Sequence, residues 1–120
     1  MKIFITVATG FIGSHLFECL AKKGHEVVGI DNLSDYYDVN LKLDNIECTK
    51  KVGVQFLKAD LRNLEAYSNI GDDFDFIYHF AAQPGLSKDS TFESYLDNNV
   101  VATKTLIEFT KTQKQLKHFF

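Results

Sequence analysis

Two glycines follow the first apolar run of the chain at the spacing G-x-x-G. Gly10 and Gly13 lie between "KIFITV" (2–7) and "FIGSHLFECLAKKG" (11–24). Glycine lets a backbone approach a phosphate closely, and the free N–H groups at a helix N-terminus favour an anion. Turns also hold glycine for steric reasons alone. The position after an apolar run and before a helical pattern is what makes these glycines predict nucleotide binding.

Asp31 is the second residue that could do chemistry. It ends "EVVGID" (26–31), 21 residues after Gly10 (31 − 10), and Asn32 follows it. In a dinucleotide fold, a carboxylate at this distance accepts hydrogen bonds from the adenosine ribose and repels the 2′-phosphate of NADP. We therefore expect NAD as the cofactor. The alternative is an acid that begins a helix in a solvent loop.

Alternating patterns supply the elements that would position these residues. Short apolar runs predict strands over 2–7, 26–31, 54–60, 74–80 and 116–120. Helical patterns predict helices over 11–24, 34–47, 63–70 and 91–113. Parallel strands need crossover connections, and those connections are right-handed. The order predicts an α/β fold, a doubly wound parallel sheet covered on both faces.

Apolar residues at helical spacing predict one face of each helix. Gly24 is expected to cap the first helix. The first helix places on one face Ile12, Leu16, Cys19 and Leu20. The second has at helical spacing Val39, Leu43 and Ile46. The long helix has along one side Phe92, Leu96, Val100, Thr103 and Ile107.

Composition indicates one globular domain and excludes several classes of partner. The 120 residues are 45% hydrophobic with a net charge of −3, and no basic run indicates nucleic acid or an anionic membrane. Cys19 and Cys48 lack metal-ligand spacing and are too few for a disulfide framework, which favours a cytoplasmic protein. No segment reaches the ~18 apolar residues of a membrane span. The apolar start lacks a cleavage site typical of secretion.

The last residues, "LKHFF" (116–120), read as the beginning of a fifth strand. Apolar residues at the start of a strand need a sheet neighbour, and nothing after them supplies a helix for the far side of that edge. We therefore expect an N-terminal piece of a longer protein, truncated at the fifth strand, whose exposed surfaces favour a homodimer or other self-association.

Five segments together carry a resemblance to a known family: "TVATGFIGSH" (6–15), "GIDNLSDYYDVNLK" (29–42), "KADLRN" (58–63), "HFAAQPG" (79–85) and "NNVVATKTLIE" (98–108). In this order they resemble the N-terminal half of the NAD-dependent nucleotide-sugar epimerases and dehydratases, the extended short-chain dehydrogenases. "DNLSDYYDVNLK" is most similar to UDP-glucuronate 4-epimerases and then to UDP-glucose 4-epimerases. The resemblance implies a Rossmann-type domain that binds NAD, within an enzyme acting on a UDP-sugar.

The family's first loop reads T-G-x-x-G-x-x-G, and one position departs from it. The matching residues are Thr6, Gly10, Phe11, Ile12 and Gly13. Val7 occupies the first glycine. A β-branched side chain there restricts the backbone and adds bulk beside the pyrophosphate. The sequence leaves open whether this loop binds NAD weakly or has lost it.

The resemblance also implies contacts farther along the chain. Asp60 and Leu61 match an acidic–apolar pair that lies against the adenine, although Asp60 or Asn63 could instead cap the next helix. Phe80, Ala81 and Ala82 match a stretch beneath the cofactor.

Two further regions match positions near the family's active centre. Asn99 matches an asparagine close to that centre, and Gln83 to Ser87 begin the loop that reaches toward the substrate. His79, just before the cofactor stretch, reads as a packed residue rather than a base.

Catalysis in the family uses a Tyr-x-x-x-Lys pair, in which tyrosine removes a hydroxyl proton as hydride moves to NAD. Four residues after the tyrosines of this chain stand Asn40, Leu41, Gly71, Ala82 and Asn99. The 120 residues therefore contain no such pair, and we expect them to be inactive alone. Two alternatives stay open: a non-catalytic nucleotide-binding module, or a degenerate remnant without ligand. A receiver domain is disfavoured, because Ala8 and Thr9 stand where its acidic pair would follow the first strand.

Overall fold

A five-stranded parallel sheet forms the centre of the molecule. The computed structural model describes residues 1–34, 39–50, 55–85 and 90–120. The strands stand in the order β3-β2-β1-β4-β5, and every pairing is parallel. Their bounds are β1 Lys2–Thr6, β2 Glu26–Asp31, β3 Gln55–Lys58, β4 Phe76–His79 and β5 His118–Phe119. The predicted doubly wound α/β fold is confirmed.

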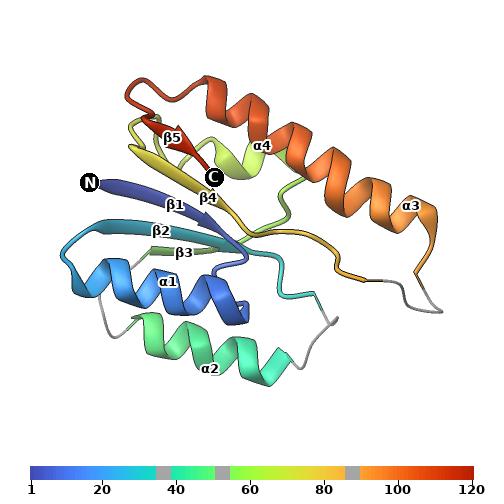
Figure 1. Cartoon of the computed structure of the whole chain (residues 1–120), viewed down its shortest axis with the longest axis horizontal. Helices are drawn as coiled ribbons and strands as arrows, with labels where there is room; N and C mark the ends of the chain where they lie inside the picture. Colours follow the sequence, from blue (N-terminus) through green and yellow to red (C-terminus); the bar gives the residue numbers. More distant parts are fainter. Residues whose placement is uncertain (35–38, 51–54, 86–89) are drawn as a thin grey trace.

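Helices cover the two faces of this sheet (Figure 1). One face carries α1 (Phe11–Lys22) and α2 (Val39–Lys50). The other carries the 3-10 turn η1 (Leu64–Tyr67) and a long helix that projects beyond the sheet. The long helix has three parts in sequence: α3 (Phe92–Tyr95), the π-helical η2 (Leu96–Val101) and α4 (Ala102–Lys111).

The core has two halves because successive strand residues point to opposite faces. Phe4 of β1 packs on the α4 side with Leu106 and Phe109. Its neighbours Ile3 and Ile5 point to the other face, where they pack with Phe17 of α1. The face between α1 and β2 is close-packed, since a Cβ on Gly29 would lie 2.5 Å from a ring carbon of Phe17.

The predicted face of α1 is partly wrong. Leu16 and Leu20 pack against the core, but Ile12 is 64% exposed and Cys19 is exposed as well. The most buried residues of α1 are instead Gly13, Ser14 and Phe17. A Cβ on Gly13 would lie 2.1 Å from the Val7 carbonyl oxygen, so close approach of α1 at this glycine sets which side of the helix faces the sheet.

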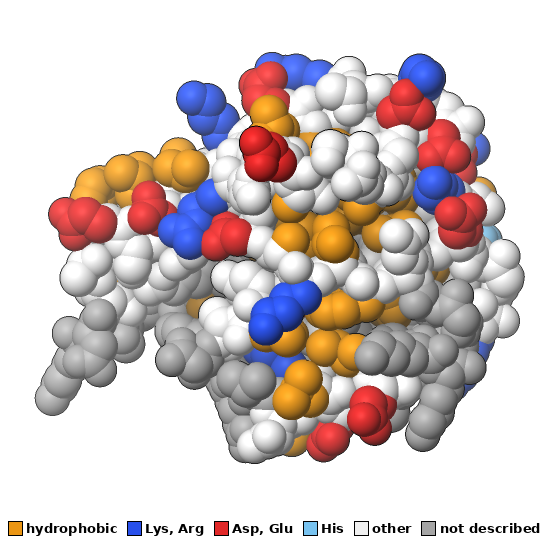
Figure 2. Space-filling model, turned by 180° about the vertical axis from the view of Figure 1, so that it is seen from behind, with side chains coloured by type: hydrophobic (Ala, Val, Ile, Leu, Met, Phe, Trp, Pro, Cys, Tyr) orange, Lys and Arg blue, Asp and Glu red, His pale blue; other side chains and the backbone are white. Residues whose placement is uncertain are grey.

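Four of the five residues predicted on the apolar side of the long helix are exposed, and the fifth, Thr103, contacts His79 of β4. Phe92 is 74% exposed and Val100 is 56% exposed, and Leu96 and Ile107 are exposed too. Figure 2 shows hydrophobic side chains along the upper edge of the part of the molecule that projects to the left, where α3 lies. The buried side of α4 consists of Ala102, Leu106 and Phe109. This exposed stripe of Phe92, Leu96, Val100 and Ile107 is called the outer stripe below.

Most element boundaries follow the sequence, with local exceptions. Gly24 has φ +80°, as expected for a residue that ends a helix. Of the helix predicted over 34–47, residues 35–38 lie outside the described part, and α2 spans Val39–Lys50; in it Leu43 is exposed while Ile46 is buried. The helix predicted over 63–70 is a single 3-10 turn, which Asn63 caps by accepting from the Glu65 N–H at 3.0 Å. Among the described residues, no helix is long and apolar enough to cross a membrane.

Candidate functional site

A cavity of about 420 Å³ opens at the carboxyl ends of the strands. The chain runs outward from β1 to β3 and then returns to the other side of β1 for β4, so the direction of winding switches between β1 and β4. Ligands of open α/β sheets bind at such a switch point. Of the predicted site residues, the cavity is lined by Gly10, Asp31, Asn32, Asp60, Leu61, Ala81 and Ala82.

Five predicted site residues stand outside this lining. Phe11 and Ile12 begin α1 with exposed side chains, so only their backbone N–H groups, free as in any first helical turn, can serve an anion. Gly13 is packed beneath Val7. Phe80 is 37% exposed and stacks on Tyr78.

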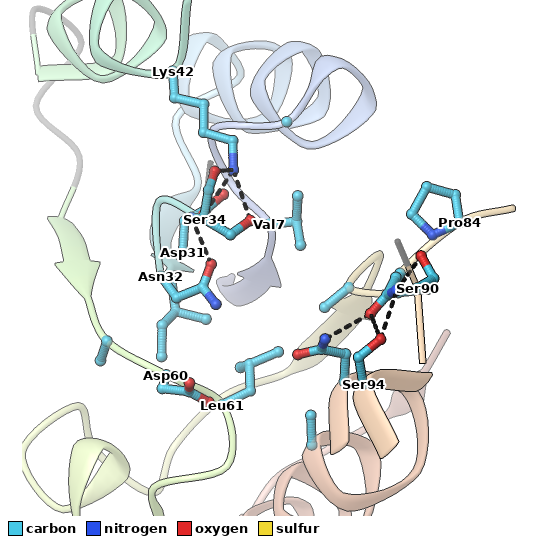
Figure 3. A pocket seen from close by; sticks show the side chains of 18 residues that line it. Val7, Asp31, Asn32, Ser34, Lys42, Asp60, Leu61, Pro84, Ser90 and Ser94 are labelled. Atoms are coloured by element: carbon cyan, nitrogen blue, oxygen red, sulfur yellow. Dashed lines mark hydrogen bonds and ion pairs between the residues drawn. The ribbon is translucent and has the colours of Figure 1, made fainter. Parts of the chain in front are cut away.

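Asp31 is buried and held by the chain itself. Its Oδ2 accepts from the Thr9 hydroxyl at 2.6 Å and lies 3.4 Å from the Thr9 N–H. Its Oδ1 accepts from the Leu33 N–H at 2.8 Å. Figure 3 shows Asp31 and Asn32 on one side of the cavity, across from Ser90 and Ser94.

Lys42 of α2 brings a cation to the same end of the cavity. Its Nζ lies 3.7 Å from Asp31 Oδ1 and donates to the Ser34 carbonyl oxygen at 3.0 Å (Figure 3). Both side chains of the Asp31–Lys42 pair are less than a tenth exposed. A buried charge is tolerated only when it is paired, so Lys42 offsets the charge of Asp31.

Val7 forms the turn between β1 and Gly10 in a left-handed conformation, with φ +53°. This region favours glycine and is an outlier for a β-branched residue. The Val7 side chain lines the cavity, and its Cγ1 would lie 2.6 Å from a Cβ on Gly10. The valine therefore packs over the glycine whose backbone would have to approach a phosphate.

Thr6, at the end of β1, fixes the backbone that follows β4. Its Oγ1 accepts from the N–H groups of Phe80 and Ala81, both at 3.0 Å. The same oxygen lies 3.0 Å from His79 Nδ1. A hydroxyl has one hydrogen, and two donors already point at this oxygen, so Thr6 donates its hydrogen to Nδ1.

The second nitrogen of His79 settles the tautomer. Nε2 lies 2.9 Å from the Thr103 hydroxyl, which donates its own hydrogen to the Asn99 carbonyl oxygen at 2.7 Å. Nε2 must therefore carry a hydrogen and donate it to Thr103. Burial lowers the pKa of His79 below its ordinary value. His79 is thus neutral, and its hydrogen bonds join β1 and β4 to the long helix. This agrees with the prediction that His79 is a packed residue rather than a base.

Asn99 holds the segment after Ala82 rather than facing the cavity. Its Oδ1 accepts from the Gln83 N–H at 2.6 Å, and its Nδ2 donates to the Gln83 carbonyl oxygen at 3.2 Å. Asn98 donates to Gln83 Oε1 at 2.8 Å. Both asparagines lie in η2, and the wider turn of a π-helix is a common feature of functional sites.

Asp60 lines the cavity beside Leu61 (Figure 3). Arg62 donates to the Asp60 carboxylate through Nε at 3.0 Å and Nη2 at 2.6 Å, and these hydrogen bonds lower the pKa of Asp60. Arg62 also reaches Asp97 of η2 at 3.5 Å. Asp60 therefore caps no helix, since Asn63 does, and its orientation is fixed by Arg62.

Sequence reasoning missed Lys42 and Thr9, and it assigned Gln83 to the substrate loop without its hydrogen bonds to Asn99. Lys42 lies four residues before the buried Ile46, so its place on the inner side of the helix was a signal that could have found it. Thr9 and Gln83 each make several hydrogen bonds to segments distant in the sequence, which no local pattern reveals. Ser87, predicted to lie in the substrate loop, is outside the described residues.

Comparison with known proteins gives one consistent result. Residues 3–120 match the model of the NAD dependent epimerase/dehydratase family. Protein CapI of Staphylococcus aureus is 37% identical over 114 residues, which are 92% of this chain and 34% of CapI. UDP-glucuronate 4-epimerase 1 of Arabidopsis thaliana is 32% identical over 92% of this chain and 27% of its own length. The chain thus spans about a third of the length of these relatives.

Solved structures agree with the sequence relatives. UDP-glucuronic acid 4-epimerase from Bacillus cereus, crystallised with UDP-glucuronic acid and NAD, has a TM-score of 0.86 at 39% identity. The match covers 99% of this chain and 38% of that one. A UDP-galactose 4-epimerase has a TM-score of 0.75 at 30% identity. The chain belongs to the NAD dependent epimerase/dehydratase family and corresponds to the N-terminal part of its members.

Proposed function

We propose that these 120 residues are the NAD-binding portion of a nucleotide-sugar 4-epimerase, acting on UDP-glucuronate or UDP-glucose. The carrying observation is the convergence of a G-x-x-G turn, Asp31 and the small Ala81 and Ala82 on one cavity at the switch point of the sheet. In such an enzyme the C4 hydroxyl is oxidised to a 4-keto intermediate and then reduced from the other face. NAD supplies the reversible hydride acceptor for that inversion.

The residues of the cavity fit an adenine dinucleotide at one end. Asp31 and Asn32 would face the adenosine ribose, and Asp60 with Leu61 would lie against the adenine. Ala81 and Ala82 leave room beneath the nicotinamide half, and the N-terminus of α1 would face the pyrophosphate. Val7 is the misfit, because its side chain lies over Gly10. We propose that NAD binding by this chain is weak for that reason.

The same 120 residues are proposed to bind without turnover. They contain no Tyr-x-x-x-Lys pair, so no tyrosine is placed to take a proton from the sugar hydroxyl. A second candidate is a non-catalytic nucleotide-binding module or a remnant without ligand. The observation that favours it is the strained Val7 turn.

We also propose that the protein forms a homodimer through the outer stripe. Phe92, Leu96 and Val100 are exposed at helical spacing on α3 and η2, and exposed apolar surface of this kind marks interaction sites. A Val100→Lys variant should sediment as a monomer while the unmodified chain sediments as a dimer. A monomeric unmodified chain would contradict the proposal.

The UDP-sugar is the proposed partner, and the proposed location is the cytoplasm. Two features of the sequence support the cytoplasm: it has no basic run, and its two cysteines lack metal-ligand spacing. Cell fractionation, with the protein found in the membrane fraction, would contradict it.

A blocking substitution tests the cofactor proposal. Ala82 is exposed and lines the cavity, so Ala82→Leu fills the cavity without disturbing the core. Asn69→Leu adds the same side chain at an exposed position outside the lining. In calorimetric titrations up to millimolar NAD, the chain and Asn69→Leu should bind, and Ala82→Leu should not. Equal binding by all three, or none by a folded chain, would refute the proposal.

A further inference from the structure

Thr9 makes the shortest hydrogen bond to Asp31. Its hydroxyl donates to Oδ2 at 2.6 Å, and its N–H points at the same oxygen from 3.4 Å. The other oxygen, Oδ1, accepts from the Leu33 N–H at 2.8 Å. Lys42 Nζ is 3.7 Å from Oδ1, an ion pair beyond hydrogen-bond distance. Within the described part of the chain, Oδ2 of Asp31 therefore accepts from two donor groups, both of Thr9, and Oδ1 from one, the Leu33 N–H.

A ribose presents two adjacent hydroxyls, and a carboxylate holds both when each of its oxygens accepts one. Each carboxylate oxygen has about two acceptor directions. Both acceptor directions of Oδ2 are directed at Thr9, whereas among the residues that the structure describes Oδ1 accepts a hydrogen bond in only one direction, from Leu33. Asp31 can therefore accept one ribose hydroxyl but not two.

We propose that Thr9 is a specificity-determining residue, which closes Oδ2 of Asp31 to the second ribose hydroxyl. The inference rests on the proposed function, because it concerns the ribose at the same cavity. In consequence the site recognises one hydroxyl of the ribose, and the Thr9 hydroxyl lowers the affinity for every adenine nucleotide.

The surroundings keep Thr9 in place. Thr9 is 3% exposed, and Asn45 Nδ2 donates to its carbonyl oxygen at 3.0 Å. A ligand therefore cannot push the threonine toward solvent. The same bond fixes the backbone independently of the side chain, so Thr9→Ala should fold and remove only the hydroxyl and its methyl group.

Three nucleotides and three proteins test the proposal. AMP, 2′-deoxy-AMP and 3′-deoxy-AMP are titrated into the chain, Thr9→Ala and Thr9→Ser, with affinities read from NMR shifts. These nucleotides carry no pyrophosphate, so the Val7 side chain does not oppose a pyrophosphate in this titration. In the chain and in Thr9→Ser, which keeps the hydroxyl, only one of the two deoxy nucleotides should bind more weakly than AMP.

In Thr9→Ala, both deoxy nucleotides should bind more weakly than AMP, and AMP itself should bind about tenfold more tightly than to the chain. AMP affinity that is equal or weaker in Thr9→Ala would overturn the proposal and make Thr9 a residue that merely orients Asp31. If AMP binds to none of the folded proteins, the adenosine site is itself refuted, and the proposed function fails with it. The two failures are therefore distinguishable.

Discussion

The turn after β1 and the segment after β4 line the same cavity but are held in different ways. After β4, side-chain hydrogen bonds from Thr6 and Asn99 fix the backbone of Phe80, Ala81 and Gln83. After β1, Val7 holds a left-handed conformation that its side chain disfavours. The segment after β4 is held by hydrogen bonds from side chains of other segments, whereas the turn after β1 persists because the packing around Val7 leaves no alternative.

The neighbours that hold Val7 are identifiable. Its carbonyl oxygen accepts from the Gly10 N–H at 3.0 Å and lies beneath the close approach of Gly13. Strain of about 1–3 kcal/mol persists at one residue only where the surrounding structure over-determines it. The packing of α1 on the sheet therefore stabilises a turn that the sequence at Val7 opposes.

The largest change in the free energy of unfolding is expected when Asn99 is replaced. Asn99→Leu leaves the N–H and carbonyl of Gln83 without partners, which should lower the free energy of unfolding by about 2 kcal/mol. Asn98→Leu is the matched control, since within the described ranges the Asn98 side chain bonds the Gln83 side chain and not its backbone. Urea unfolding measures both. Equal losses for the two variants would show that the backbone bonds do not hold this segment.

Relief of strain after β1 should have a smaller effect of opposite sign. Val7→Gly should raise the free energy of unfolding by about 1 kcal/mol, because relief of the left-handed conformation exceeds the conformational entropy that glycine adds. Val7→Ala keeps a Cβ and should gain less. Thermal and urea unfolding give the comparison, and a destabilised Val7→Gly would contradict the strain assigned to Val7.

The smallest effect concerns pH. Burial lowers the pKa of His79 in the folded state, so the unfolded chain binds a proton more readily. The contribution of His79 to stability is full above the ordinary histidine pKa of about 6.5 and is lost as pH falls through the lower folded value. His79→Gln should flatten this part of the stability profile. An Nδ1-protonated tautomer in nitrogen NMR spectra would contradict the hydrogen-bond assignment.

The sequence predicted the sheet well because its strands are short apolar runs whose periodicity is local. The apolar run 26–31 placed Asp31 at the end of β2, as the structure has it. The predicted face of α1 was partly wrong and that of the long helix mostly wrong, since close approach at Gly13 and the π-helical turn of η2 depend on packing. The partners of Asp31 were missed because Thr9 and Lys42 are brought to it from separate segments.

The central claim is the proposal that the Val7 side chain, lying over Gly10, weakens NAD binding at the cavity. Calorimetric titration of NAD into the chain and into Val7→Gly tests it directly. Removal of a side chain from the path of the pyrophosphate should tighten binding about tenfold, as expected for the loss of roughly 1.4 kcal/mol of steric opposition. Equal affinities for the two proteins, or no binding by a folded Val7→Gly, would contradict the account.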